Sequence, residues 1–375
     1  MQEISVSPLR LALGGAVAMG CAMGIGRFVY TPLLPFMAEA IPLTASQAGM
    51  IASANFLGYL LGAVATSFRL PGAPKLWLLG ALAASAFTTG AVGLSSSAEV
   101  IAVLRFLGGT ASAFALVFAS SQVLDGLARA GRSSLTWVHF AGVGIGIALS
   151  SQVILLPTDW AGMWFASGLA SLIGVVAVGL LVPAQPMATP VAPSAAAGQG
   201  SGGLIRLALA YGLFGFGYVI TATFLIAIVR EAPNLRAFEP VAWLVVGLAA
   251  LPSVLIWVTI GRRIGLERAY AVSCAVEAIG VLLSLWNTTA GILLSAVLLG
   301  GTFVGITALG LQAARAKAVG DPLRALGLMT TAFSIGQIIG PTFAGHLRDS
   351  TGSYALPTIA AAVALVLATA LTWRR

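Results

Sequence analysis

Charged residues are scarce in this chain. Asp, Glu, Lys and Arg make up 8% of its 375 residues, whereas soluble domains carry roughly a quarter. Apolar residues account for 59%, and the mean hydropathy is +1.00. So little charge cannot cover a globular exterior in water. The composition therefore excludes a soluble protein and predicts an all-α integral membrane protein.

Residue patterns for catalysis and cofactor binding are missing as well. The two cysteines, Cys21 and Cys274, lie inside apolar runs, which argues against a disulfide framework or a cysteine metal site. No span carries a pair of acids, no His and Cys cluster has metal-ligand spacing, and no loop has the P-loop pattern. We predict no enzyme activity, no catalytic residue, no cofactor, no metal and no ATP-driven transport.

Long apolar runs are what the chain has instead. A membrane-spanning helix needs about 20 mostly apolar residues, and polar or Gly/Pro-rich breaks divide the chain into twelve such runs. The predicted spans are residues 10–38, 46–68, 76–97, 99–123, 134–156, 161–183, 204–229, 240–260, 269–288, 290–313, 326–347 and 355–373.

The basic residues are unevenly distributed over the loops. Of the 19 Lys and Arg residues, 14 lie at the termini or in the even-numbered loops, and three lie in the odd-numbered loops. By the positive-inside rule both termini are cytoplasmic. The net charge of +8 therefore reflects membrane topology and not nucleic-acid binding. We predict a multi-pass membrane protein.

A Pro-, Ala- and Gly-rich segment divides the chain nearly in half. Residues 184–203 are predicted to be a flexible cytoplasmic linker between two six-helix bundles, residues 1–183 and 204–375. Three patterns recur between the halves at offsets of 191 to 194 residues: Gly24-Ile-Gly26 with Gly215-Phe-Gly217, Leu107-Gly-Gly-Thr110 with Leu299-Gly-Gly-Thr302, and Gly142/Gly146 with Gly336/Gly340.

Repeats of six spans enter the membrane in the same sense and are related by an axis along the membrane normal. This parallel pseudo-repeat is the plan of an alternating-access transporter. The paired glycines allow close helix approach, either within or between bundles.

Several stretches resemble one protein family. They are Gly24-Ile-Gly-Arg-Phe-Val-Tyr-Thr-Pro-Leu-Leu-Pro35, Asn55-Phe-Leu-Gly-Tyr-Leu-Leu-Gly62, Arg105-Phe-Leu-Gly-Gly109, His139-Phe-Ala-Gly-Val-Gly144, Asp159-Trp160, Gly215-Phe-Gly-Tyr218, Gly300-Gly-Thr-Phe303 and Gly336-Gln-Ile-Ile-Gly-Pro341. Through them the chain resembles the major facilitator superfamily, and within it the bacterial YbfB/YjiJ family of transporters, which implies a place in the bacterial inner membrane. The resemblance implies a central cavity lined by spans 1, 4, 7 and 10, and it implies no particular substrate.

Two departures from the superfamily pattern matter for gating. The loop after span two, Gly62 to Lys75, lacks the usual acid, which puts the cytoplasmic gating charge pair in doubt. Span five lacks the proline that follows the paired glycines in drug antiporters, which lowers the case for an antiporter.

Three charged residues lie in the interior of predicted spans: Arg27, Arg105 and Glu277. Charge in a membrane core is costly, so each is a functional hypothesis. Arg27 is a candidate for binding the charged end of a substrate, because its guanidinium offers a planar fork of donors that matches a carboxylate. The alternative is a structural arginine bonded to helix-end carbonyls. Arg105 has two interpretations: it takes part in proton coupling or substrate binding, or it has a scaffold role. Glu277 is a candidate proton carrier, although a structural hydrogen bond is the stronger interpretation.

The remaining candidates are polar side chains on spans expected to face the cavity. His139 titrates near working pH and is a candidate for substrate binding or proton coupling, or a core histidine. Neutral groups fix the orientation of a ligand with few hydrogen bonds. Tyr30 falls three residues after Arg27, on roughly the same helix face. The neutral candidates for substrate binding are Tyr30, Asn55, Tyr218, Thr221, Gln312 and Gln337. Trp160 and Trp164 are typical of anchors at the outer interface.

Together these features predict a monomeric secondary transporter of a small organic anion, with protons as a candidate coupling ion. Arg27 and Arg105, with His139 near them, would form a positive wall facing a mostly neutral wall. The first alternative is a proton-coupled exporter of drug-like or hydrophobic compounds, with Arg105 and Glu277 as the coupling pair. The second is a receptor or scaffold that transports nothing.

Overall fold

The computed structural model describes residues 7–68, 70–184, 201–318 and 322–373, and no β-strand occurs among them. Each predicted span falls on a helix, and the first falls on three segments, α1, the π-helical η1 and α2. Residues 185–200 of the predicted linker lie outside the described residues, and α8 begins at Ser201, earlier than predicted. The segments are α1 (Pro8–Met19), η1 (Gly20–Ile25), α2 (Tyr30–Ala40), α3 (Ala45–Ala65), α4 (Pro74–Ala91), α5 (Ala98–Arg129), α6 (Thr136–Gln152), α7 (Trp160–Leu181), α8 (Ser201–Glu231), α9 (Glu239–Ile264), α10 (Leu266–Leu283), α11 (Thr289–Lys317), α12 (Pro322–Thr351) and α13 (Ala355–Thr372).

The helices have the length and composition of membrane spans. Within the described residues, nine helical segments are long and apolar enough to cross a membrane, or ten if α9, bent by 43° beside Pro252, is one span. Helices α10 and α12 fall outside this set. Helix α10 contains Glu267, Arg268 and Glu277. The all-helical membrane class is thus confirmed, and the count of twelve spans stays a prediction.

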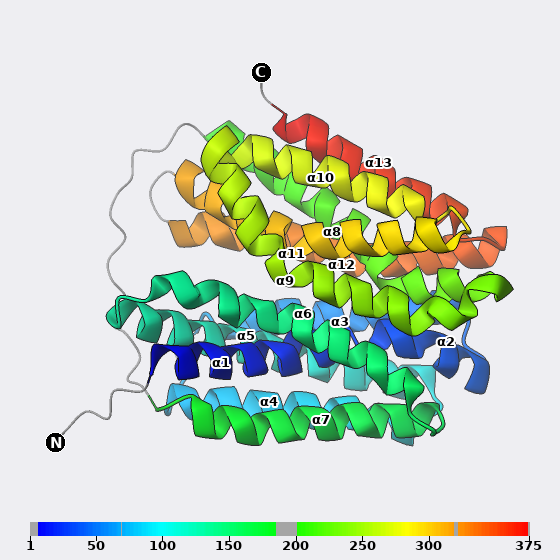
Figure 1. Cartoon of the computed structure of the whole chain (residues 1–375), viewed down its shortest axis with the longest axis horizontal. Helices are drawn as coiled ribbons and strands as arrows, with labels where there is room; N and C mark the ends of the chain where they lie inside the picture. The colour runs from blue at the N-terminus through cyan, green and yellow to red at the C-terminus, as the bar shows by residue number, and fades with distance from the viewer. Residues whose placement is uncertain (1–6, 69, 185–200, 319–321, 374–375) are drawn as a thin grey trace.

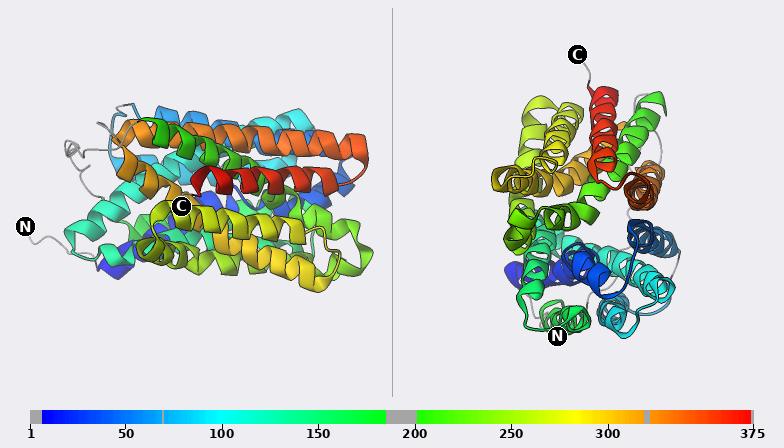
Figure 2. Two further views of the ribbon diagram at one scale, coloured as in Figure 1. Left: turned by 90° about the horizontal axis from the view of Figure 1, so that it is seen from above. Right: turned by 90° about the vertical axis from the view of Figure 1, so that its right-hand side faces the viewer.

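The helices form two bundles that lie side by side (Figure 1). Helices α1 to α7 pack among themselves, as do α8 to α13, and the end-on view in Figure 2 separates the two groups. The bundles meet through α3 on α12, α6 on α9 and α2 on α8. The start of α1 and the end of α13 lie toward the same end of the molecule, which we call the terminal end.

The paired glycines have equivalent roles in the two bundles. A Cβ at Gly142 in α6 would lie 2.0 Å from the carbonyl oxygen of Ala16 in α1. A Cβ at Gly336 in α12 would lie 2.1 Å from the carbonyl oxygen of Gly212 in α8. Each distance is far below contact, so only glycine permits these approaches. The predicted repeat therefore has a structural basis, and these glycines pack helices within a bundle.

The bundles are joined at the end opposite the termini, which we call the closed end. There the guanidinium of Arg230 in α8 lies 3.2 Å from the carboxylate of Glu39 in α2 and forms a second ion pair with Glu239. Deeper in the seam, the hydroxyl of Ser53 donates to the carbonyl of Ile338 at 2.6 Å and accepts from Thr342 at 2.8 Å. These contacts close one face of the interface between the bundles.

Asp349, at the end of α12, caps the start of α3 in the other bundle. Its carboxylate accepts the backbone N–H groups of Ala45 and Ser46 at 3.0 and 2.8 Å. Burial acts to raise the pKa of Asp349, but hydrogen bonds from Ser46, Ala45 and Thr44 outweigh it, so the pKa lies below its ordinary value. A depressed pKa means that the stabilisation is present above the ordinary Asp value of about 3.9 and is lost as the pH falls through the lower folded value. The cap is therefore complete at pH 5.5 and at pH 7.5.

Replacing Asp349 with alanine is expected to loosen the closed end. Loss of a capping side chain costs about 1 kcal/mol, which is about fivefold in an opening equilibrium. A thiol introduced as Ser53→Cys should then be labelled about five times faster, at both pH values, and the background is low because Cys21 and Cys274 are buried. Asp159→Ala is the matched control, because Asp159 caps α7 within a single bundle. Equal labelling in the two variants would contradict the role assigned to Asp349.

Candidate functional site

The first span is broken at its centre. The π-helical turn η1 ends at Ile25, and α2 begins only at Tyr30. Pro32 lies in the first turn of α2 and has no N–H, so a backbone carbonyl of the preceding turn lacks its usual donor. Arg105 of α5 supplies donors at this break, because its guanidinium bonds the carbonyls of Gly26 and Arg27 at 2.7 and 2.8 Å. The contacts of Arg105 are thus those of a scaffold residue, one of the two roles that the sequence left open.

Arg27 projects from the break toward the other bundle. Its Nη2 donates to the Oε1 atom of Gln337 in α12 at 2.9 Å, and Gln337 in turn donates to the hydroxyl of Tyr218 in α8. The rings of Phe56 and Tyr59 each lie 4.5 Å from the guanidinium carbon, within cation–π range. One arginine from the N-terminal bundle is therefore bonded to a polar network of the C-terminal bundle.

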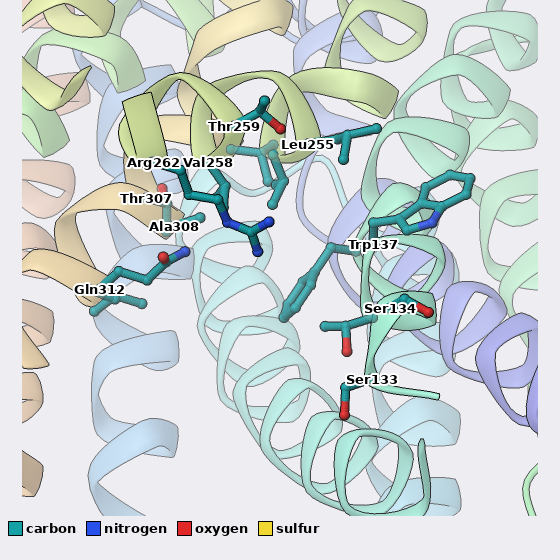
Figure 3. Close-up of a pocket in the computed structure, with 15 residues that line it drawn as sticks. Ser133, Ser134, Trp137, Leu255, Val258, Thr259, Arg262, Thr307, Ala308 and Gln312 are labelled. Atoms are coloured by element: carbon teal, nitrogen blue, oxygen red, sulfur yellow. The ribbon is translucent and has the colours of Figure 1, made fainter. Parts of the chain in front are cut away.

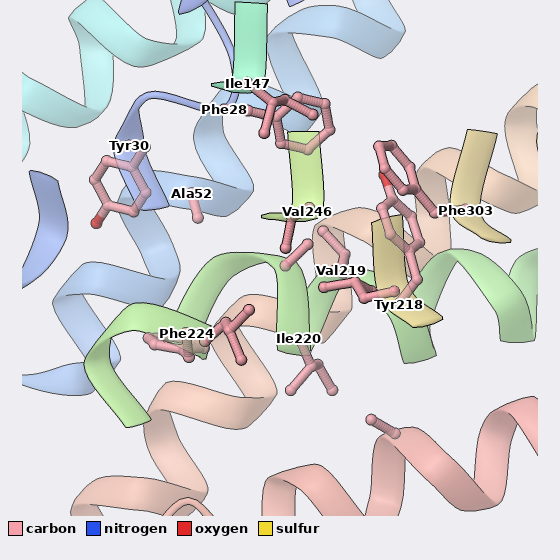
Figure 4. Close-up of a cluster of buried hydrophobic side chains, with 14 of the residues drawn as sticks. Phe28, Tyr30, Ala52, Ile147, Tyr218, Val219, Ile220, Phe224, Val246 and Phe303 are labelled. Carbon is pink, nitrogen blue, oxygen red and sulfur yellow. The ribbon is translucent and has the colours of Figure 1, made fainter. Parts of the chain in front are cut away.

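An aromatic cluster adjoins this network. The ring of Tyr218 is stacked with those of Phe303 and Phe333 at centroid distances of 5.8 Å. Phe28, next to Arg27, meets Phe303 edge-on, also at 5.8 Å. Figure 4 shows Tyr218 beside Phe303 and shows Tyr30 pointing away from them. Aromatic walls next to a guanidinium are suited to a ligand with both a flat apolar part and a negative charge.

A small cavity lies at the break, between the two bundles. Its volume is about 10 Å³, which is the space for one water molecule. Arg27, Asn55 and Arg105 line it from one bundle, and Thr223 lines it from the other. No acid lines the cavity, and neither arginine forms an ion pair with any described acid. Two guanidinium groups thus share the centre of the molecule without an anionic partner among the described residues.

Tyr30 and Asn55 line the cavity, but both hold the backbone. The hydroxyl of Tyr30 donates to the carbonyl of Ala48 at 2.8 Å, and its ring lies under Arg105 and not beside Arg27. Counting along an unbroken helix placed Tyr30 on the face of Arg27, and the break invalidates that count. Asn55 donates to the carbonyl of Arg105 at 2.8 Å and leaves its own oxygen buried without a partner among the described residues.

His139 and Gln312 do not join the central site. His139 is buried against Gly15 and Val123, with Ser120 at 3.1 Å from its Nε2 atom, so the expectation that it lies near the two arginines is wrong. Gln312 lines a different space, a cleft of about 380 Å³ between α6, α9 and α11 toward the terminal end (Figure 3). Both residues were assigned to the site because of the spans that carry them, but the number of a span does not give the depth of a residue in the membrane.

Glu277 and Thr221 lie inside the C-terminal bundle. Both carboxyl oxygens of Glu277 are buried without a hydrogen bond to any described residue. Its polar neighbours are Tyr218, Tyr270, Cys274 and Thr302. Arg105 is in the other bundle, so the pair required by the exporter hypothesis is not formed in this conformation. The hydroxyl of Thr221 is likewise buried and unpartnered within the described part of the chain, and Thr223, not Thr221, lines the cavity.

Sequence reasoning missed aromatic residues that contact the two arginines. Phe56 and Tyr59 contact the guanidinium of Arg27. Both lie in the family-like stretch Asn55 to Gly62, one and four residues after Asn55, and this stretch could have identified them. Trp164 was assigned to the outer interface, which is wrong, because it is fully buried with its ring 5.8 Å from the guanidinium carbon of Arg105. A buried arginine needs apolar and π-rich neighbours, and that need could have drawn attention to Trp164.

The comparison with protein families decides the identity of the chain. The model described as the uncharacterised MFS-type transporter YbfB matches residues 19–373. The chain belongs to this family. The resemblance recognised in the motifs is thereby confirmed, and the family makes the chain a multi-pass membrane transporter of a small-molecule substrate.

Solved structures support the same fold for this YbfB-family transporter. A crystal structure of a mutant of the nucleoside transporter NupG matches with a TM-score of 0.75 at 14% identity, covering 97% of this chain and 98% of that chain. A second crystal structure of NupG matches with a TM-score of 0.71 at 15% identity and the same coverage. Identity this low shows the fold alone. A comparison with curated proteins finds no match.

Proposed function

We propose that this YbfB-family protein is a secondary active transporter that moves a small organic anion by alternating access in the bacterial inner membrane. The observation that carries the proposal is the pair of buried arginines at the bundle interface, with exposed fractions of 5% for Arg27 and 3% for Arg105. Buried charge without a counter-charge is costly. An anion bound at Arg27 would supply that counter-charge.

The two ends of the molecule support the alternating-access part of the proposal. The closed end is held by ion pairs and by the cap at Asp349, whereas the bundles are separated by the cleft toward the terminal end. With both termini in the cytoplasm, this conformation is closed to the outside. The central cavity of about 10 Å³ is too small for an organic anion. The bundles must therefore move apart for Arg27 to receive its ligand.

A panel of solutes tests the substrate class. A ligand at about 100 times its dissociation constant stabilises the folded protein by about 2.7 kcal/mol. We expect organic anions to raise the melting temperature of the purified protein and lipophilic cations to leave it unchanged. Nucleosides form a third arm because NupG is named as a nucleoside transporter and the rings around Tyr218 could stack a base. A shift with nucleosides or cations alone would overturn the anion proposal, and a shift with cations would favour the exporter.

Proton coupling is proposed at Glu277 alone. It is the one acid in the interior of a predicted span, and its oxygens have no hydrogen-bond partner among the described residues. Removing the proton would leave a bare charge in the bundle. We expect Glu277→Gln, which mimics the protonated side chain, to keep the fold and ligand binding but to lose uptake driven by an imposed pH gradient. Glu267→Gln is the control, because Glu267 pairs with Lys317 near the surface. Gradient-driven uptake retained in Glu277→Gln would exclude Glu277 as the proton carrier.

A further inference from the structure

The cleft toward the terminal end contains a cation that the central site does not use. Arg262, near the end of α9, projects into the space between α9 and the helix that carries Trp137 (Figure 3). None of the ion pairs or hydrogen bonds found among the described residues involves its guanidinium. No acid lines the cleft. A guanidinium exposed in a concave site without a counter-charge is a ready partner for an anionic group.

The walls around Arg262 have two kinds of surface. Thr307 and Gln312 of α11 lie on one side of Arg262 (Figure 3), and Trp137 and Phe140 of α6 with Val258 of α9 supply apolar surface. Trp137 is 46% exposed and Leu255 at the same cleft is 54% exposed. Trp137 and Leu255 therefore offer exposed apolar surface at the cleft, which the apolar body of an amphipathic molecule would cover.

We propose that this cleft binds an amphipathic monoanion, with its acidic head on Arg262 and its apolar body against Trp137, Phe140 and Val258. The proposal rests on the anion-transport function above and narrows the substrate class to amphipathic acids. The cleft volume of about 380 Å³ falls within the range of small-molecule sites, roughly 300 to 1,000 Å³. The central cavity, at about 10 Å³, does not, so in this conformation the cleft can receive such a molecule and the central site cannot.

Chain length and charge test this assignment independently. Each buried methylene contributes about 0.8 kcal/mol, or about fourfold in affinity. We expect the affinity of straight-chain carboxylates from hexanoate to decanoate to rise steeply with length, measured by calorimetry on the full chain in nanodiscs of zwitterionic lipid, with empty nanodiscs subtracted. Decanol, which lacks the charge, should bind at least tenfold more weakly. Affinity that is independent of chain length, or equal for decanol and decanoate, would overturn the proposal.

Two adjacent arginines provide a matched pair of variants. Both Arg262 and Arg263 are exposed at the end of α9, but only Arg262 lines the cleft. Arg262→Gln should weaken decanoate binding at least tenfold, and Arg263→Gln should leave it unchanged. Equal weakening in both would indicate general surface charge and would overturn the proposal. Because both side chains are exposed, neither variant is expected to unfold the protein.

Two further arms separate the source of the anion and the two proposals. Phosphatidylglycerol in the nanodisc offers the same chemistry from a lipid head group, and its competition with decanoate at Arg262 would identify the occupant as a bilayer lipid. If phosphatidylglycerol does not compete with decanoate, the occupant is the free acid. Either result supports an amphipathic monoanion at Arg262. Arg27→Gln should retain cleft binding while losing transport. If Arg27→Gln transports normally, the transport proposal fails at its central site although binding at Arg262 still stands.

Discussion

Replacing Arg27 with glutamine is expected to abolish binding of the transported anion at the central site, and to leave the fold and the cleft at Arg262 intact. The only hydrogen-bond partner of the Arg27 side chain in the described structure is neutral Gln337, which glutamine can still bond. Hydrogen bonds to charged groups contribute about 1.5 to 3 kcal/mol each. Losing two such bonds to a carboxylate therefore lowers the affinity by about a hundredfold or more. Removing an uncompensated buried charge relieves a desolvation penalty, which offsets the lost contacts with Phe56 and Tyr59.

Two readings from one experiment separate binding from structure. Thermal unfolding without ligand should give the Arg27→Gln variant a melting temperature equal to or above that of the natural protein. Thermal unfolding with the anion should give a smaller shift than in the natural protein, because only the cleft at Arg262 still binds it. Arg27→Lys retains the charge but not the fork of donors, and we expect it to bind weakly. A variant that unfolds early, or one that binds with unchanged affinity, would assign Arg27 to the scaffold.

Much of the architecture was predictable from the sequence because a bilayer restricts the possible structures. Every backbone amide in lipid must bond internally, so an apolar run of about 20 residues becomes a helix almost regardless of its detailed sequence. The paired glycines at Gly142 and Gly336 identified the repeat for a similar reason, since close helix approach admits no larger residue. Arg27 was recognisable because charge is so rare in a membrane core.

The composition of the site was less predictable, because the sequence gives neither the depth nor the facing of a polar residue. His139 and Gln312 were grouped with the arginines by span number, yet one packs beside Gly15 and the other lines the terminal cleft. Tyr30 was placed by the helical period, which fails across the break after Ile25. The glycines and prolines on either side of Arg27 were the visible signal of that break. They could have shown that free carbonyls there would need a donor from elsewhere.

Arg105 is that donor, and replacing it with alanine is expected to have the opposite profile to Arg27→Gln. Its guanidinium holds two backbone carbonyls that have no other partner among the described residues at the break, and its ring neighbours are Tyr30 and Trp164. Losing both charged donors and leaving two buried acceptors unpaired should cost about 3 to 5 kcal/mol, a large part of the stability of a domain. Arg105→Lys provides a single ammonium in place of the fork and should recover only part of this.

Chemical denaturation in detergent measures the loss, and binding at low temperature shows whether the site survives in the molecules that stay folded. We expect Arg105→Ala to unfold early and yet to bind the anion when folded, because its donors are occupied by Gly26 and Arg27 and not by ligand. A stable Arg105→Ala variant that has lost binding would instead make Arg105 a direct ligand of the anion. The two arginines would then form one site, and the carbonyl bonds seen here would belong only to the empty, closed conformation.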